Sequence, residues 1–119
     1  MAKILIVDDS QTQVQTITKI LKKHGHDTIT AEDGDAAVSV SRTELPDLIL
    51  MDVVMPGLNG FQATRHITKN QSTQHIPVIM LSSKDQETDK VWAERQGASD
   101  YIIKPASEDK LMAAINNLL

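Results

Sequence analysis

Short runs rich in apolar and β-branched residues recur along this chain, and each precedes a longer stretch with helical residue spacing. The clearest run spans residues 48–51, carries no charge, and ends at Asp52. Its residues do not alternate between apolar and polar, which indicates a strand buried on both faces, as in a parallel sheet. The expected strands span residues 4–7, 28–31, 48–51, 77–81 and 100–103.

The stretches after these runs predict helices. Ser10, with Gln13 three residues later, predicts a capping box at the start of the first helix, and Gly25 predicts its end. The fourth helix is poor in apolar residues, with Val91 and Trp92 as its only strong ones. Further helices are expected at residues 35–43, 61–70 and 85–96, and an apolar stripe at Leu111, Ala114, Ile115 and Leu118 predicts the last one.

This succession of β-α units predicts an α/β domain with an open, doubly wound, five-stranded parallel sheet. No repeat, low-complexity tract or linker divides the 119 residues, so we expect a single domain over residues 1–119. In such a fold, ligands bind beyond the carboxyl ends of the strands. Residues with a chemical role should therefore directly follow the expected strands.

Three carboxylates follow the first and third expected strands. Asp8 and Asp9 come directly after residues 4–7, and Asp52 comes after the third run. These acids would repel one another at one edge of the sheet unless a cation lies among them. Oxygen ligands at this density suit Mg²⁺, and the backbone carbonyl of Val54 is placed to complete the set. The sequence therefore predicts a magnesium site.

Hydroxyl and ammonium groups follow the fourth and fifth expected strands. Ser82 can donate a hydrogen bond to a phosphoryl oxygen, and Lys104 can add a positive charge beside it. A metal next to a carboxylate balances phosphoryl charge and favours in-line attack. Asp52 is then the nucleophile and becomes an acyl phosphate.

Each of these residues also has an ordinary structural explanation. An aspartate pair after a strand often caps a helix, and a Lys-Pro pair is common in loops. Ser83 or Asp85 could cap the fourth helix in the same way. The joint occurrence of all these groups after four different strands favours the phosphoryl-acceptor interpretation.

Composition excludes several other classes of protein. The net charge of −4 argues against binding to nucleic acid phosphates, although it permits a basic protein partner. No apolar run is long enough to span a membrane, and the absence of cysteine excludes thiolate chemistry and disulfides. A cytoplasmic location is the default expectation.

Four segments together resemble the receiver domain of bacterial two-component response regulators. They are VDDS at 7–10, LMDVVMPGLNG at 50–60, MLSSK at 80–84 and DYIIKP at 100–105. The resemblance covers the whole chain, leaves no output domain, and implies a flavodoxin-like fold with strand order 2-1-3-4-5. Three further segments resemble stand-alone regulators of the twitching-motility (type IV pilus) chemosensory pathway, namely PGLNGFQATR at 56–65, SSKDQETDKVW at 82–92 and RQGASDY at 95–101.

The resemblance implies roles for the acidic and basic residues. Asp52 would accept a phosphoryl group from the phosphotransfer domain of a histidine kinase, in a Mg²⁺-dependent reaction. Asp9 would touch the metal directly, Asp8 would act through water, and Lys104 would contact the phosphoryl group. The Lys104–Pro105 peptide bond would be cis.

The resemblance also implies how the signal is transmitted. Ser82 would be the switch hydroxyl and Tyr101 the switch aromatic residue. The output would be a changed protein-binding surface, formed by the fourth helix, the fifth strand and the last helix, on a monomeric protein. The sequence leaves open which kinase and target are involved, and whether the protein instead drains phosphate from a sister regulator.

Other classes of function fit less well. A small Mg²⁺-dependent phosphatase of the haloacid-dehalogenase type carries a second Asp two residues after the first, and Val54 stands there. We therefore expect no turnover of external substrates, only self-phosphorylation and dephosphorylation. A nucleotide-binding domain would need a glycine-rich phosphate loop, which is absent.

The sequence allows more than one role for Trp92 and places the histidines away from the predicted metal site. Trp92 either covers the edge of the core or anchors a partner on the surface. None of the four histidines follows an expected strand, so we expect none at the acidic edge of the sheet. His24-Gly25-His26 is expected to form the turn at the end of the first helix.

Overall fold

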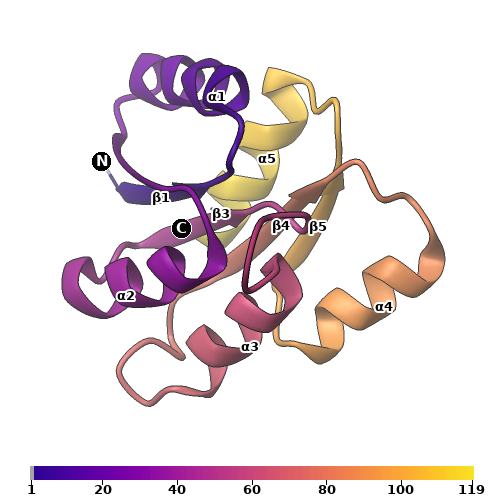
Figure 1. The fold of residues 1–119 in the computed structure, drawn as a ribbon. Helices are drawn as coiled ribbons and strands as arrows, with labels where there is room; N and C mark the ends of the chain where they lie inside the picture. Colours follow the sequence, from indigo (N-terminus) through magenta and orange to yellow (C-terminus); the bar gives the residue numbers. More distant parts are fainter. Residues whose placement is uncertain (1) are drawn as a thin grey trace.

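Residues 2–119, which the computed structural model describes, alternate between five parallel strands and five helices (Figure 1). The strands are β1 (Lys3–Val7), β2 (Asp27–Ala31), β3 (Leu48–Met51), β4 (Val78–Ser82) and β5 (Asp100–Ile103). The helices are α1 (Gln11–Lys23), α2 (Gly34–Glu44), α3 (Gly60–Lys69), α4 (Glu87–Arg95) and α5 (Glu108–Leu118). The sheet order β2-β1-β3-β4-β5 confirms the predicted doubly wound, flavodoxin-like fold.

Helices cover both faces of the sheet, with α1 and α5 on one side and α2, α3 and α4 on the other (Figure 1). The burial of β1 explains why its residues do not alternate between apolar and polar. Ile4 and Ile6 pack in the core beneath α1 and α5, while Leu5 and Val7 pack in the core beneath α2, α3 and α4. Both faces of the strand are therefore buried, as in other parallel sheets. Within residues 2–119, no helix is both long and apolar enough to cross a membrane.

The start of α1 differs from the expected capping box. Ser10 Oγ accepts a hydrogen bond from the N–H of Gln13 at 3.4 Å, as a helix N-cap does. The N–H of Ser10, however, donates to Asp8 Oδ1 at 2.9 Å. The second half of the box is missing because a buried carboxylate already uses that donor.

The start of α3 also differs slightly from the expectation. It begins at Gly60 because Asn59 and Gln62 form a complete capping box, with N–H to side-chain distances of 2.9 and 3.0 Å. The Asn-x-x-Gln spacing is visible in the sequence, and it could have placed the start of this helix.

Helix α4 is shorter than expected, and neither Ser83 nor Asp85 caps it. It starts after Gln86, whose N–H donates to Asp89 Oδ2 at 3.2 Å. Of its nine residues only Ala93 is buried, and the side chain of Trp92 is 49% exposed. Trp92 is therefore only half-buried, and the choice between an edge-of-core residue and a partner anchor stays a prediction.

Candidate functional site

The carboxyl ends of β1 and β3 bring three acids together. Val7 pairs with Met51 in the register of the two strands, so Asp8 and Asp52 leave the sheet side by side. One carboxylate oxygen from each of Asp8, Asp9 and Asp52 lies within 4.8 Å of the others. Hard oxygen ligands at this spacing fit a small divalent cation such as Mg²⁺.

Lys104 connects two of these acids, although it lies far away in the sequence. Its Nζ lies 2.9 Å from Asp8 Oδ2 and 3.5 Å from Asp52 Oδ1. Asp8 is almost completely buried and is also held by the N–H of Ser10. One ammonium among three carboxylates leaves an excess of negative charge at the site, which a divalent cation would offset.

The two oxygens of Asp52 have different surroundings. Oδ1 accepts a hydrogen bond from the N–H of Val53 at 2.9 Å and faces Lys104, whereas Oδ2 accepts none from the described residues. Burial raises the pKa of the Asp52 carboxyl, and the Asp8 charge adds to this, while Lys104 opposes the rise. One oxygen is thus fixed in place, and the other is free of hydrogen bonds from the described residues.

The loop after β3 is held close to Asp52 by a glycine. The N–H of Gly60 donates to the carbonyl of Val53 at 2.8 Å. A side chain at Gly60 would overlap the carbonyl oxygen of Asp52. The sequence analysis missed this positioning role, because Gly60 entered it only as the last residue of the LMDVVMPGLNG segment.

Val54 presents its side chain to solvent, 60% exposed. The predicted metal contact involves its backbone carbonyl, which this exposure does not affect. That contact stays a prediction.

Ser82 and Tyr101 both bond to the backbone of Lys84. Ser82 is the last residue of β4, within the strand rather than after it, and is fully buried. Its Oγ accepts from the N–H of Lys84 at 3.2 Å, and the hydroxyl of Tyr101 donates to the carbonyl of Lys84 at 2.8 Å. The sequence could not indicate this link, since backbone groups carry no residue-specific signal.

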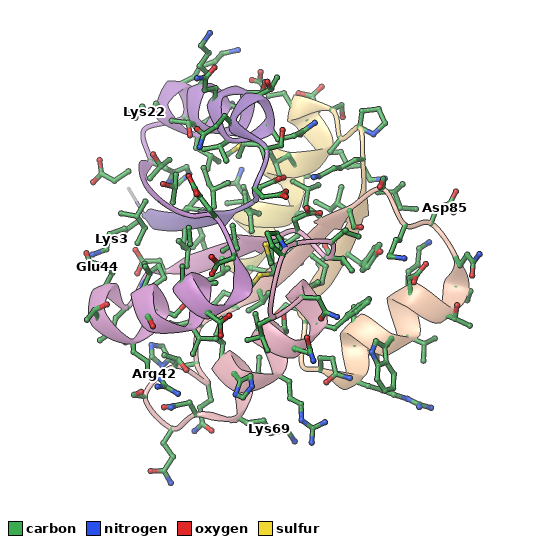
Figure 2. The ribbon with its side chains drawn as sticks, viewed as in Figure 1. Lys3, Lys22, Arg42, Glu44, Lys69 and Asp85 are labelled. Atoms are coloured by element: carbon green, nitrogen blue, oxygen red, sulfur yellow. The ribbon has the colours of Figure 1, made fainter. Side chains whose placement is uncertain are left out.

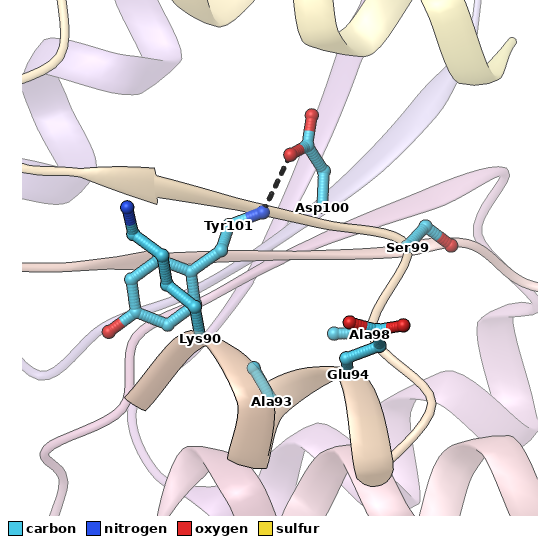
Figure 3. Close-up of a pocket in the computed structure, with 7 residues that line it drawn as sticks. All are labelled: Lys90, Ala93, Glu94, Ala98, Ser99, Asp100 and Tyr101. Atoms are coloured by element: carbon cyan, nitrogen blue, oxygen red, sulfur yellow. Dashed lines mark hydrogen bonds between the residues drawn. The ribbon is translucent and has the colours of Figure 1, made fainter. Parts of the chain in front are cut away.

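A groove of about 400 Å³ opens between α4 and β5 (Figure 3). Tyr101 lines it together with Lys90 and Glu94 from α4. Burial raises the pKa of the half-buried Tyr101 hydroxyl, so it stays protonated as a hydrogen-bond donor. A movement of this ring would change the shape of the groove.

The histidines with described contacts bond elsewhere, as expected. His24 Nε2 lies 3.0 Å from Glu108 Oε2, which connects the end of α1 to the start of α5. His26 is buried, and its Nδ1 accepts the N–H of Ala2 at 3.1 Å. Gly25 between them adopts a positive φ of 85°, as a turn at a helix end requires.

Two further predictions, one about a peptide bond and one about the metal-binding side chains, have clear outcomes. The Lys104–Pro105 peptide bond is cis, as the resemblance implies. Across residues 2–119, the group of side chains spaced to hold a metal ion consists of Asp8, Asp9 and Asp52 and includes no histidine.

Comparisons with known proteins agree with this geometry. The family model of the response regulator receiver domain matches residues 4–116. Protein PilH from Pseudomonas aeruginosa is 57% identical over 119 residues, which cover 100% of this chain and 98% of PilH. Protein PilG from the same organism is 42% identical over 114 residues, covering 95% of this chain and 84% of PilG. Several other relatives are longer, and the chain spans 26 to 51% of their length.

A solved structure extends the comparison to the metal site. The receiver domain of the sensor histidine kinase PA1611 from Pseudomonas aeruginosa was solved with a magnesium ion coordinated in its active site cleft. It is similar to this chain with a TM-score of 0.91 and 28% identity, covering 98% of this chain and 96% of that one. The chain belongs to the family of response regulator receiver domains.

Proposed function

We propose that Asp52 accepts a phosphoryl group from the phosphotransfer domain of a histidine kinase. The supporting observation is the environment of Asp52, with Oδ1 held by Val53 and Lys104 and Oδ2 left without a partner among the described residues. Oδ2 forms the new bond to phosphorus while the bond from phosphorus to the kinase imidazole nitrogen breaks, and the imidazole keeps those electrons. Lys104 offers its charge to the transferred phosphoryl oxygens.

Asp8, Asp9 and Asp52, with the backbone carbonyl of Val54, would hold Mg²⁺. The carboxylate oxygens within 4.8 Å of one another support this ligand set. When bound, the ion balances the charge of phosphoryl oxygens. The ion pair with Lys104 and the N–H of Ser10 hold Asp8 in position for this task.

Ser82 and Tyr101 would report phosphorylation to the surface. A hydrogen bond from Ser82 Oγ to a phosphoryl oxygen would change its contact with Lys84, whose carbonyl also anchors Tyr101. Helix α4 has little buried surface to hold it in one position, so it can move with this loop. The altered surface of α4, β5 and α5 would then bind a downstream protein.

The similarity to PilH and PilG supports a role in chemosensory control of type IV pilus twitching motility. In this role the chain acts as a single domain over residues 1–119, in the cytoplasm, as a monomer that binds proteins rather than nucleic acid. Val54 stands where an acid/base Asp would serve a phosphatase, so catalysis concerns only its own phosphoryl group.

The phosphorylation step is tested by incubation with acetyl phosphate and Mg²⁺, followed by intact mass. Wild type and the control Asp85→Asn, an exposed acid before α4 (Figure 2), should gain about 80 Da. Asp52→Asn should gain nothing, and EDTA should prevent the reaction. An adduct on Asp52→Asn equal to that of wild type would refute the assignment.

The reporting step is tested separately through the single tryptophan. Trp92 lies exposed on α4, so its fluorescence monitors this helix. Acetyl phosphate should change the emission of wild type and leave Asp52→Asn unchanged. Ser82→Ala and Tyr101→Phe should still gain mass but show little fluorescence change. A full fluorescence response in both variants would contradict their proposed role.

A further inference from the structure

A groove lined by basic side chains opens between the C-terminal ends of α2 and α3. Arg42 lies in the last turn of α2, and His66 and Lys69 lie in the last turn of α3. With Arg65 and Asn70 they line a hollow of about 300 Å³, called here the basic groove. Figure 2 labels Arg42 and Lys69 on this side of the molecule.

The cations of the basic groove are not neutralised by the protein itself. Arg42, Arg65 and Lys69 are all exposed, and none has a carboxylate within 4.0 Å in the part of the chain that the structure describes. Lys3, in contrast, pairs with Glu44 at 3.4 Å. Three permanent positive charges thus gather on a protein whose net charge is −4.

The groove also offers mainly hydrogen-bond donors. Arginine and lysine side chains only donate. The side-chain oxygen of Asn70 already accepts from the N–H and hydroxyl of Ser72, at 2.9 and 2.6 Å, which leaves its amide N–H₂ group. A ligand rich in acceptors and negative charge complements this lining, and carboxylates pair well with arginine.

Helix stability explains only part of this arrangement. A cation in the last turn of a helix interacts favourably with the helix dipole, which accounts for Arg42 and Lys69 taken singly. The dipole does not explain why two helix ends converge with no acid between them, nor why Arg65 joins from one turn earlier. The convergence itself points to a ligand.

We propose that the basic groove docks an acidic segment of a partner protein, an extended stretch rich in Asp and Glu. The lining cations are exposed rather than buried, which suits a segment that makes many weak contacts. A long nucleic acid would be repelled by the negative charge of the rest of the surface.

The location of the basic groove separates it from the phosphorylation site. Helices α2 and α3 run back from the carboxyl ends of the strands, so their C-terminal ends lie at the opposite end of the sheet from Asp52. If Asp52 accepts a phosphoryl group as proposed above, a partner held there would stay bound in both phosphorylation states. The docking itself does not depend on it.

The test is fluorescence anisotropy with a labelled octaglutamate peptide and the whole chain. The charge-reversal variant Arg42→Glu/Arg65→Glu is compared with Lys19→Glu/Lys22→Glu, which reverses two exposed charges on α1. Both variants have the same net charge. We expect the groove variant to weaken binding at least about tenfold and the control to change it less than about twofold. Binding should also weaken as salt rises from about 50 to about 500 mM.

Three results would overturn the proposal. The peptide could fail to bind wild type at low salt, or both variants could weaken binding equally, which would indicate only net charge. A labelled single-stranded oligonucleotide of equal charge could bind more tightly than the peptide. Far-UV circular dichroism checks folding, and if the glutamate variant is unfolded, Arg42→Gln/Arg65→Gln is compared with Lys19→Gln/Lys22→Gln, with at least about threefold weakening expected.

Discussion

Replacing Lys104 by glutamine is expected to destabilise the metal-free protein by about 3 kcal/mol. Its Nζ lies 2.9 Å from Asp8 Oδ2 and 3.5 Å from Asp52 Oδ1. At an effective dielectric constant of ~20, each pair attracts by about 5 kcal/mol before the cost of desolvation is subtracted. Removing one partner of a buried ion pair costs about 3–5 kcal/mol net. The lower end of this range of about 3–5 kcal/mol applies because the side chains of Lys104 and Asp52 are 16% and 12% exposed and so keep some contact with water.

The assay is urea unfolding in EDTA, followed by far-UV circular dichroism. With a slope of ~1.5 kcal/mol/M, the expected loss lowers the urea midpoint by about 2 M. The control is Lys84→Gln, an exposed lysine with no carboxylate within 4.0 Å among residues 2–119, which should change stability by less than ~0.5 kcal/mol. Adding Mg²⁺ should stabilise Lys104→Gln more than wild type, because its acidic cluster is less neutralised. Equal small losses in both variants would refute the reasoning.

Three further predictions follow from individual contacts. Gly60→Ala should lower the free energy of unfolding, measured with urea, by more than about 2 kcal/mol and slow phosphorylation by acetyl phosphate, because the added methyl overlaps the carbonyl oxygen of Asp52. Unchanged stability and an unchanged phosphorylation rate would contradict this. Burial lowers the pKa of His26 below its value of ~6.5 in the unfolded chain. The contribution of His26 to stability is therefore complete above about pH 6.5 and decreases as the pH falls further, because protonation of Nδ1 breaks the hydrogen bond from the N–H of Ala2. Urea midpoints between about pH 5 and 8 should show a weaker pH dependence for His26→Gln than for the exposed control His75→Gln, and identical profiles would argue against this role. Trp92→Ala should cost less than ~1 kcal/mol because the side chain is 49% exposed, whereas a loss above ~2 kcal/mol would show that it packs in the core.

The positions of the central strands β1, β3 and β4 could be predicted because their residues are apolar on both faces. The run at residues 48–51 is completely buried in the structure, and its end at Asp52 follows from the first charge. Boundaries were less accurate where side chains cap the backbone. Helix α3 starts one residue earlier than expected through the Asn59–Gln62 box, and α4 starts two residues later, after Gln86.

The sequence by itself determined the class of fold and which side chains gather at the carboxyl edge of the sheet. Central strands buried on both faces indicate a parallel sheet, and a parallel sheet places Asp8, Asp9 and Asp52 at one end. Only the tertiary structure decided how these groups bond to each other. Lys104 pairs with Asp8, 96 residues away, and thereby fixes a buried acid.

The same holds for the contacts that involve the backbone. Tyr101 bonds to the carbonyl of Lys84, and two helix ends bring Arg42 beside Arg65 and Lys69. Such contacts depend on distances of a few ångströms between distant segments. Local residue patterns carry no information about those distances, because packing of the whole domain sets them.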